Sequence, residues 1–275
     1  MCITKNLKVL DGDKILYILS KFKKEKWRWR LIKRNDKLMK IAFLTLGCKV
    51  NQYESDSIIY VLKNMGHEVF SHLTEADLYI INTCAVTNEA EKKSRQAIAR
   101  CKSFNKEAKI LVCGCASEKN SKQFEDIEGV TFIGGVANKI NLAYNLDKCG
   151  TYLEEHSKEY DDVYISVPTK TRAYIKIQDG CNNFCSYCII PYLRGRSRSR
   201  NIVSILKEID SLSKIVKEIV ITGIDISDYK IDNEKALSLL IEKLEPYENI
   251  RFRLGSLEQG IVDEKLVKAC KKVNI

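Results

Sequence analysis

Short apolar segments that alternate with helical patterns constrain the fold of this chain more than any other feature. The first segment, Lys40–Leu46, is bounded by Gly47 and predicts a buried parallel strand. Further strands are predicted over His67–Phe70, Asp77–Asn82, Ala108–Val112 and Val130–Ile133. Helices are predicted between most of them, over Tyr53–Met65, Glu89–Phe104 and Ile140–Leu146. This alternation is typical of an α/β protein with an open parallel sheet.

A second series of strands and helices follows a predicted linker. Its strands are expected over Ala173–Gln178, Lys217–Thr222 and Asn249–Gly255, and its helices over Ile202–Val216, Ala236–Leu244 and Glu264–Lys272. Three such units are typical of part of a (β/α) barrel. A chain of 275 residues holds about two domains. We therefore expect a basic extension (1–38), an N-terminal α/β domain (39–150), a linker (151–170) and a barrel domain (171–275).

Three cysteines lie within eight residues of the second series, at Cys181, Cys185 and Cys188. Three thiolates in a short loop leave one iron of a cubic cluster without a protein ligand, whereas electron-carrying ferredoxins use four. Gly180 and the pair Asn182–Asn183 supply the backbone freedom that such a loop needs. We expect the open iron to bind S-adenosylmethionine. The alternatives are a zinc site and chance clustering in a cysteine-rich chain, although zinc sites favour paired C-x-x-C or Cys/His spacings.

Three other cysteines follow predicted strands of the first series: Cys48, Cys84 and Cys115. In a parallel sheet these loops emerge at the carboxyl edge, where open α/β sheets place their sites. The three thiols could meet there and hold a second cluster, or each could be a small buried apolar residue. Cys113 lies two residues before Cys115 and is expected to point into the core on the opposite face.

Composition and charge narrow the setting of the protein. Eleven cysteines without a secretory signal favour a reducing, cytoplasmic compartment, and no apolar run is long enough to span a bilayer. Most of the net charge of +10 lies in residues 1–40, which hold thirteen Lys or Arg and four acids. With Trp27 and Trp29, this extension could bind phosphates and bases or a membrane surface. Alternatively, Met39 is the true start instead of Met1.

Four segments together resemble one known family. They are TLGCKVNQYES (45–55), NTCAVTNEAEKKSRQAI (82–98), CGCASE (113–118) and GCNNFCSYCIIPYLRGRSRSR (180–200). These segments are similar to the methylthiotransferases, a branch of the radical S-adenosylmethionine enzymes, over about residues 39–260. The segment LGCKVNQYES resembles the corresponding segment in the branch that acts on threonylcarbamoyladenosine in tRNA. The branches for isopentenyladenosine and for a ribosomal protein tend to read GCQMN and GCPKN.

The resemblance implies a function and a set of cofactors. Cys48, Cys84 and Cys115 match the ligands of an auxiliary 4Fe-4S cluster, and the other trio, Cys181, Cys185 and Cys188, matches the ligands of the radical-generating cluster. The reaction would be methylthiolation at carbon 2 of N6-threonylcarbamoyladenosine at position 37 of tRNA, with S-adenosyl-L-methionine as cofactor. The partners would be the anticodon loop of tRNA and a reductant such as flavodoxin or ferredoxin, with no membrane. No catalytic residue beyond the cluster ligands is implied.

Two further groups of residues are weaker candidates. Tyr187, Thr222 and Gly223 could contact S-adenosylmethionine, although a tyrosine that fills its own loop and an ordinary strand–helix turn explain them as well. Four arginines alternate with small residues behind the cysteine loop. We expect them to contact tRNA or another anion, and the alternative is a solvated run of charges. They are Arg194, Arg196, Arg198 and Arg200.

The position at which the chain ends suggests an alternative to an active enzyme. Members of the family have about six strand–helix units and then a small tRNA-binding β-barrel, whereas this chain ends at Ile275 after the third unit. We therefore expect a C-terminally truncated form with an incomplete radical domain. Gln259 also stands where the family pattern has proline. An inactive or split iron–sulfur or tRNA-binding fragment, and an enzyme for isopentenyladenosine tRNA or a ribosomal protein, remain the alternatives.

Overall fold

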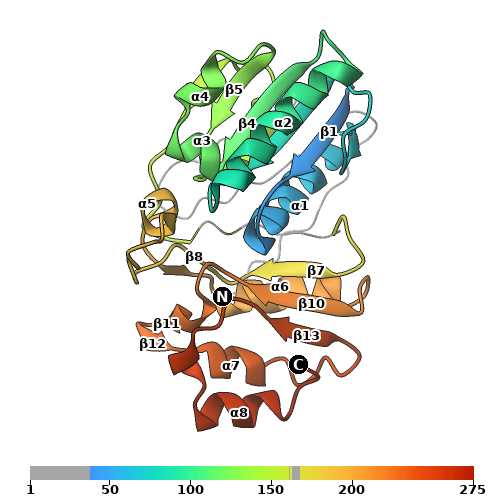
Figure 1. Ribbon diagram of the computed structural model, residues 1–275. Coiled ribbons are helices and arrows are strands. Elements are labelled where there is room, and N and C mark those ends of the chain that lie inside the picture. Colours follow the sequence, from blue (N-terminus) through green and yellow to red (C-terminus); the bar gives the residue numbers. More distant parts are fainter. Residues whose placement is uncertain (1–37, 161, 163–167) are drawn as a thin grey trace, which may run out of the picture. The chain divides into compact units, whose positions relative to one another are not determined.

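A computed structural model describes residues 38–160, 162 and 168–275 of the protein. The basic extension with Trp27 and Trp29, and also Cys2, lie outside the described residues. Residues Met39–Ile275 form one compact unit that contains two parallel sheets (Figure 1). No helix in the described part of the chain is long and apolar enough to cross a membrane.

The first sheet has six strands, all parallel, in the order β2-β1-β3-β4-β5-β6. The strands are β1 (Lys40–Thr45), β2 (Glu68–Phe70), β3 (Leu78–Thr83), β4 (Lys109–Gly114), β5 (Val130–Gly134) and β6 (Gly150–Tyr152). Strand β3 is buried at every position, as a central strand covered on both faces should be. The parallel α/β sheet expected from the sequence is confirmed.

Helices cover both faces of this sheet. They are α1 (Lys49–Asn64), α2 (Asn88–Phe104), α3 (Cys115–Lys119), α4 (Lys122–Glu125) and the 3-10 helix η1 (Lys139–Tyr144). Helices α1 and η1 pack on one face through Ile58 and Leu142, and α2 and α4 pack on the other through Ile98 and Phe124. The N-terminus of α2 is capped by Thr87, whose hydroxyl accepts a hydrogen bond from Ala90 N at 3.1 Å.

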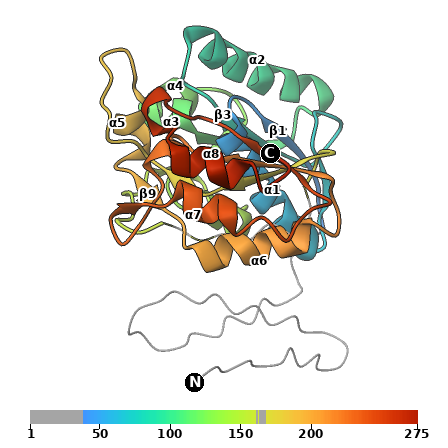
Figure 2. The same cartoon turned by 90° about the horizontal axis from the view of Figure 1, so that it is seen from below.

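The second sheet has three parallel strands in the order β13-β10-β7. Its strands are β7 (Ala173–Lys176), β10 (Glu218–Thr222) and β13 (Arg251–Leu254), and its helices are α6 (Ile202–Leu212), α7 (Leu237–Glu242) and α8 (Glu264–Cys270). Figure 2 shows α6, α7 and α8 running alongside one another. Buried Ile219, Ile221 and Leu240 belong to the single apolar core of this half.

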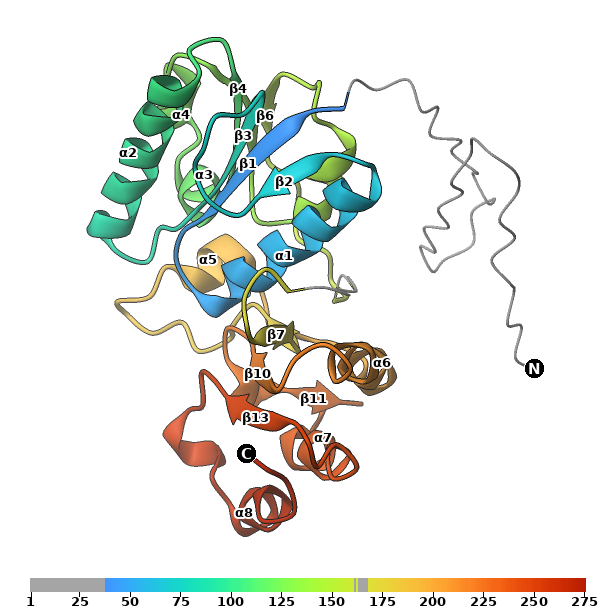
Figure 3. The ribbon, with the colours of Figure 1, turned by 90° about the vertical axis from the view of Figure 1, so that its right-hand side faces the viewer.

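Smaller elements connect the regular ones. Helix α5 (Ile190–Arg194) follows the cysteine loop, and β8 (Gln178–Asp179) pairs antiparallel with β9 (Arg198–Ser199). The hairpin of β11 (Lys230–Ile231) and β12 (Glu234–Lys235) and the 3-10 helices η2 (Ile226–Asp228) and η3 (Gln259–Ile261) complete the fold. Figure 3 shows α1 between the first sheet and β7, so this helix is common to both halves.

The structure differs from the predicted elements at several points. Helix α1 begins at Lys49 and not at Tyr53, because the polar side chains of Asn51 and Gln52 are buried and obscure the apolar pattern. The predicted helix Ile140–Leu146 is a short 3-10 helix. Strand β6 and helix α5 were not predicted, because both are too short for periodicity to show.

Candidate iron–sulfur site and the ion network beside it

The first trio of cysteines lies at the carboxyl edge of the six-stranded sheet. Cys48 directly precedes α1, Cys84 directly follows β3, and Cys115 is the first residue of α3 after β4. Gly47 has a φ of +99°, and a Cβ at that position would stand 2.7 Å from Cys84 Sγ. The loop after β1 therefore lies against Cys84, and only glycine fits there.

The pKa of Cys84 reflects both its burial and the thiols on the adjacent loops. Burial is the main cause that raises the pKa of Cys84, and the thiols of Cys115 and Cys48 raise it further. Cys113 packs in the cluster of Ile41 and Leu111, on the sheet face opposite to that of Cys115. Its burial raises its pKa to about 11, which is the behaviour of an inert core thiol.

The second trio lies on the loop between β8 and α5. Gly180 has a φ of +72°, and the other residue of the loop in the left-handed region is Phe184, not Asn182 or Asn183. The backbone holds the loop at both ends. Cys181 N donates to Gly195 O at 3.1 Å, and Cys188 N donates to Cys185 O at 2.9 Å. Burial raises the pKa of Cys181, and so do Asp225 and the other two thiols of the loop.

The donor chemistry of both trios is compatible with a cubic iron–sulfur cluster. Within the described ranges, no group of three or more His, Cys, Asp or Glu side chains is arranged to hold one metal ion. A zinc ion draws its ligand atoms to about 2.0–2.3 Å. A cubic 4Fe-4S cluster is held by cysteine thiolates, and three of them leave one iron open. Each trio, three thiols with no histidine or carboxylate among them, fits that requirement.

Gln178 fixes the cysteine loop against the carboxyl end of β10. Its Oε1 accepts hydrogen bonds from Ile224 N at 3.0 Å and Asp225 N at 2.8 Å. Its Nε2 donates to Gly180 O at 2.6 Å and to Ser197 Oγ at 3.0 Å. One buried amide thus joins the two loops that would enclose a cofactor. No sequence pattern singled out Gln178, because a lone glutamine carries no spacing signal.

The other predicted cofactor residues also lie in this region. Tyr187 is 89% exposed, so it does not fill the core of its own loop. The thiol of Cys185 is the main cause that raises the pKa of Tyr187, and Glu258 contributes to the increase. Thr222 is buried and ends β10, and Gly223 follows it directly. Tyr187 is the only aromatic residue of these three, and its exposed ring could stack on a ligand.

The four arginines differ in their surroundings. Arg200 is buried, where it pairs with Asp162 at 2.6 Å and with the carboxylate of Glu208. Arg194 is buried as well, and it binds carboxylates of the protein itself. Arg196 is exposed and stacks on Phe184, with 4.4 Å between its guanidinium carbon and the ring centroid. Arg198 is half-buried, lies 3.8 Å from Asp179 and donates to Arg194 O at 3.1 Å. Three of the four arginines are therefore engaged inside the protein, which leaves Arg196 for the predicted contact with an external anion.

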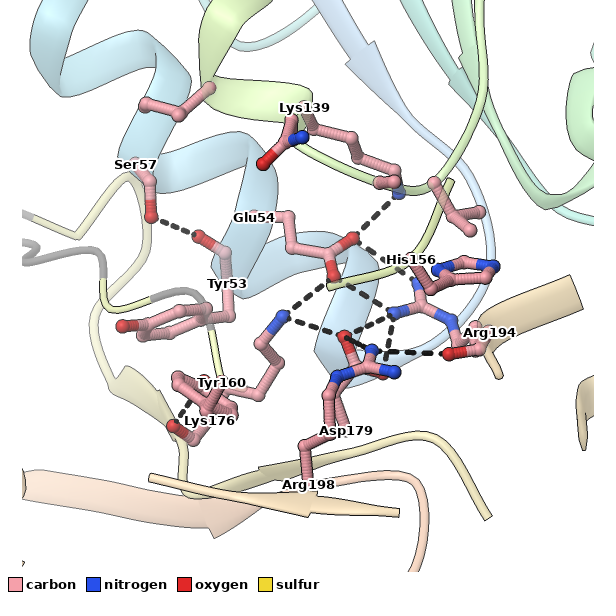
Figure 4. A pocket seen from close by; sticks show the side chains of 14 residues that line it. Tyr53, Glu54, Ser57, Lys139, His156, Tyr160, Lys176, Asp179, Arg194 and Arg198 are labelled. Atoms are coloured by element: carbon pink, nitrogen blue, oxygen red, sulfur yellow. Dashed lines mark hydrogen bonds and ion pairs between the residues drawn. The ribbon is translucent and has the colours of Figure 1, made fainter. Parts of the chain in front are cut away.

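A buried ion network joins α1 and η1 to β7, β8 and α5, the helix that follows the cysteine loop (Figure 4). Its charged members are Glu54, Lys139, Lys176, Asp179 and Arg194, each 8% exposed or less. Glu54 is the centre: its carboxylate accepts from Lys139 Nζ at 2.6 Å and from Lys176 Nζ and Arg194 at 2.9 Å. The network lines a pocket whose wall also includes Tyr53, His156 and Tyr160.

Asp179 is the second carboxylate of the network. It pairs with Lys176 and with Arg194, each at 3.0 Å, and also accepts from the backbone N of Gly180 at 2.8 Å. Asp179 lies two residues before Cys181, and Glu54 lies in α1, the helix that begins beside Cys48. Arg194, which ends α5, connects the two carboxylates and thereby the loops that carry both trios.

The charges within this network dominate its titration. Burial raises the pKa of Glu54, but Arg194, Lys139 and Lys176 together outweigh it and hold the pKa well below its usual range. For Asp179, burial likewise raises the pKa, and Lys176 and Arg194 lower it by more. Both side chains are therefore ionised at neutral pH although they are buried.

We expect this network to make the protein sensitive to acid. A carboxyl whose pKa is lower in the folded than in the unfolded chain adds stability above the unfolded pKa, which is about 4. That stability is lost as the pH falls through the folded pKa. The free energy of unfolding, measured with urea, should therefore decline steeply below about pH 4. A Glu54→Gln variant should show a shallower decline, and an equal slope would contradict the assignment.

Comparisons with known families agree with this arrangement. Residues 40–135 match the Uncharacterized protein family UPF0004, and residues 175–274 match the Radical SAM superfamily. The first range holds the trio of the six-stranded sheet, and the second holds the trio of the cysteine loop.

Curated relatives match most of the chain. The threonylcarbamoyladenosine tRNA methylthiotransferase of Bacillus subtilis is 36% identical over 246 residues, which cover 83% of this chain and 53% of the relative. The ribosomal protein uS12 methylthiotransferase of Pseudothermotoga lettingae is 34% identical, with 84% and 55% covered. The tRNA-2-methylthio-N(6)-dimethylallyladenosine synthase of Finegoldia magna is 32% identical, with 89% and 58% covered. The chain thus spans somewhat more than half the length of these relatives.

The fold, the two cysteine trios and the family matches together define a class of protein. The chain belongs to the Radical SAM superfamily, with a UPF0004 domain ahead of the radical SAM domain. The relatives that match most of its length at 32–36% identity are named as methylthiotransferases or as a 2-methylthio synthase. The resemblance stated from the sequence is confirmed.

Proposed function

We propose that this protein takes part in the methylthiolation of carbon 2 of N6-threonylcarbamoyladenosine at position 37 of tRNA. The observation that supports this most is the presence of two cysteine trios, one in each matched domain, with Cys115 in the same apolar cluster as Leu193 of the helix that follows the second trio. Sulfur insertion needs a sulfur-holding site close to the place where a carbon radical forms. A relative that is named for threonylcarbamoyladenosine tRNA, 36% identical, supports the choice of substrate.

The residues would divide the work between the two trios. Cys181, Cys185 and Cys188 would hold a 4Fe-4S cluster with one open iron for S-adenosylmethionine, and the trio of the six-stranded sheet would hold an auxiliary cluster. When bound, the first cluster and its cofactor supply the radical that removes hydrogen from carbon 2. Gln178 keeps the loop at the carboxyl end of β10, and Tyr187 offers a ring to the adenine.

The ion network would keep the two trios at a fixed separation. Glu54 and Arg194 come from different matched domains, and the Arg194 guanidinium reaches the Glu54 carboxylate at 2.9 Å. Preorganisation of this kind contributes to catalysis because the reacting groups need not be brought together at each turnover. Arg196 would contact phosphates of the anticodon loop, flavodoxin or ferredoxin would supply electrons, and the setting would be the cytoplasm.

The decisive experiment is nucleoside analysis of tRNA. A strain that lacks the corresponding methylthiotransferase, complemented with this 275-residue chain, should regain 2-methylthio-N6-threonylcarbamoyladenosine by mass spectrometry. A Cys185→Ser variant is the matched control and should not restore the nucleoside. If the wild-type chain is expressed at a normal level and the nucleoside is still absent, the proposed activity of this chain is wrong.

The names of the relatives give a second candidate function. Two of the relatives are named for dimethylallyladenosine in tRNA and for ribosomal protein uS12. The same digest would reveal 2-methylthio-isopentenyladenosine, and mass analysis of uS12 would reveal a methylthio group on the protein. A non-enzymatic iron–sulfur or tRNA-binding protein would yield none of the three products and would still bind iron.

A further inference from the structure

Lys49 extends from the UPF0004 domain to the carboxyl edge of the second sheet. It follows Cys48 directly and is the first residue of α1. A side-chain carbon built on Gly255 would stand 3.2 Å from Lys49 Nζ and 3.7 Å from Thr222 Oγ1. Gly255 follows β13, and Thr222 ends β10. The ammonium group is thus located where two strands of the radical SAM sheet end, which is the edge that carries the site.

The ammonium of Lys49 is available to a ligand. Among the residues that the structure describes, no hydrogen bond or ion pair engages its Nζ, and the side chain is exposed. The other lysines near the site, Lys139 and Lys176, are buried and bound to Glu54. The Lys49 ammonium is therefore a cation at the edge of the site that has no carboxylate partner among the described residues. Its backbone position at the start of a sixteen-residue helix adds the positive end of the helix dipole.

The substrate of the proposed function has a charge that fits this group. A threonylcarbamoyl substituent ends in a threonine carboxylate, whereas an isopentenyl substituent is uncharged. We propose that Lys49 binds the carboxylate of the threonylcarbamoyl group and so selects this nucleoside, an inference that rests on the proposed function. A lysine paired with a carboxylate makes a charge-assisted hydrogen bond, which is stronger than a neutral one.

The methionine part of S-adenosylmethionine carries a second carboxylate that Lys49 could bind. The open iron of the radical cluster would take that carboxylate, so it has no need of a lysine. Lys49 is instead the residue next to Cys48, which would bind the auxiliary cluster that holds the sulfur. The substrate carboxylate is therefore the assigned partner, and the experiment separates it from the cofactor.

The test measures binding of anticodon stem-loop RNA to the cluster-reconstituted full chain. Three RNAs are compared: one with threonylcarbamoyladenosine, one with its methyl ester, and one with unmodified adenosine. The wild-type protein should bind the acid about 10-fold to 100-fold more tightly than the ester. Lys49→Met should remove this preference, and Lys49→Arg should restore part of it. Lys63→Met, an exposed lysine at the other end of α1, should leave it unchanged.

Three outcomes would overturn the proposal. If the wild-type protein bound the acid RNA and the ester RNA with equal affinity, no cation of the protein would recognise the carboxylate. If the Lys49→Met variant kept the preference for the acid over the ester, another residue would be the one that binds the carboxylate. A loss of S-adenosylmethionine affinity in Lys49→Met, with the preference intact, would make the cofactor carboxylate the partner. Failure of the proposed function is distinct, because it would remove the methylthio nucleoside while the acid–ester preference remained.

Discussion

Replacing Cys181, Cys185 or Cys188 with serine is expected to halve the iron content of the anaerobically reconstituted protein, from about eight to about four irons per chain. The remaining cluster would be the auxiliary one. Because the radical cluster would be absent, reductive cleavage of S-adenosylmethionine to 5′-deoxyadenosine should fall to the background rate. Iron and sulfide assays, together with chromatographic detection of 5′-deoxyadenosine, measure both effects.

The other cysteines of the chain provide matched controls for this experiment. Serine at Cys48, Cys84 or Cys115 should also leave about four irons, but should spare reductive cleavage. Cys149 is exposed and belongs to neither trio, so Cys149→Ser should keep both clusters. A wild-type protein that reconstitutes with only one cluster, or with zinc, would contradict the two-cluster proposal.

Replacing Glu54 with glutamine is expected to lower the free energy of unfolding by about 3–5 kcal/mol, the usual cost of breaking a buried ion pair. The variant leaves Lys139, Lys176 and Arg194 buried with a single carboxylate, that of Asp179. Urea unfolding followed by circular dichroism at pH 7 measures the loss. The denaturant dependence should stay similar, because the same surface is exposed on unfolding.

An exposed ion pair serves as the control for Glu54. Glu264 lies 3.6 Å from Lys268 on the surface of α8, and both side chains are largely exposed. Glu264→Gln should leave the unfolding midpoint unchanged, because solvent screens such pairs. An equally small effect of Glu54→Gln would mean that the buried carboxylate does not offset its own desolvation, and the central role assigned to it would be wrong.

Much of the first sheet could be predicted because each strand has its own local signal. Lys40–Leu46 and Asp77–Asn82 are apolar runs, and the structure places β1 and β3 within one residue of them. The opposite orientation of Cys113 and Cys115 also follows from strand alternation alone. Such features need only neighbours in sequence.

Other features depend on contacts between distant residues, and no local pattern reveals them. Arg194 and Arg200 look like part of a solvated charge run, but each is buried against carboxylates more than five residues away in sequence, Glu54 and Glu208 among them. Asn51 reads as a surface residue near the start of a helix. Its side chain instead donates to Leu46 O and Thr83 O and accepts from Arg194, so it joins three separate segments.

The position of Glu54 limits how members of this family can be recombined. Its carboxylate, carried by the UPF0004 domain, is the acceptor for lysine and arginine groups carried by the radical SAM domain. A chimera that takes one domain from a relative would transplant half of a charge-balanced unit. Unless the donor supplies a compatible carboxylate and guanidinium, the graft creates a buried ion without a counterion. The two domains are therefore expected to evolve, and to be exchanged in the laboratory, as a matched pair.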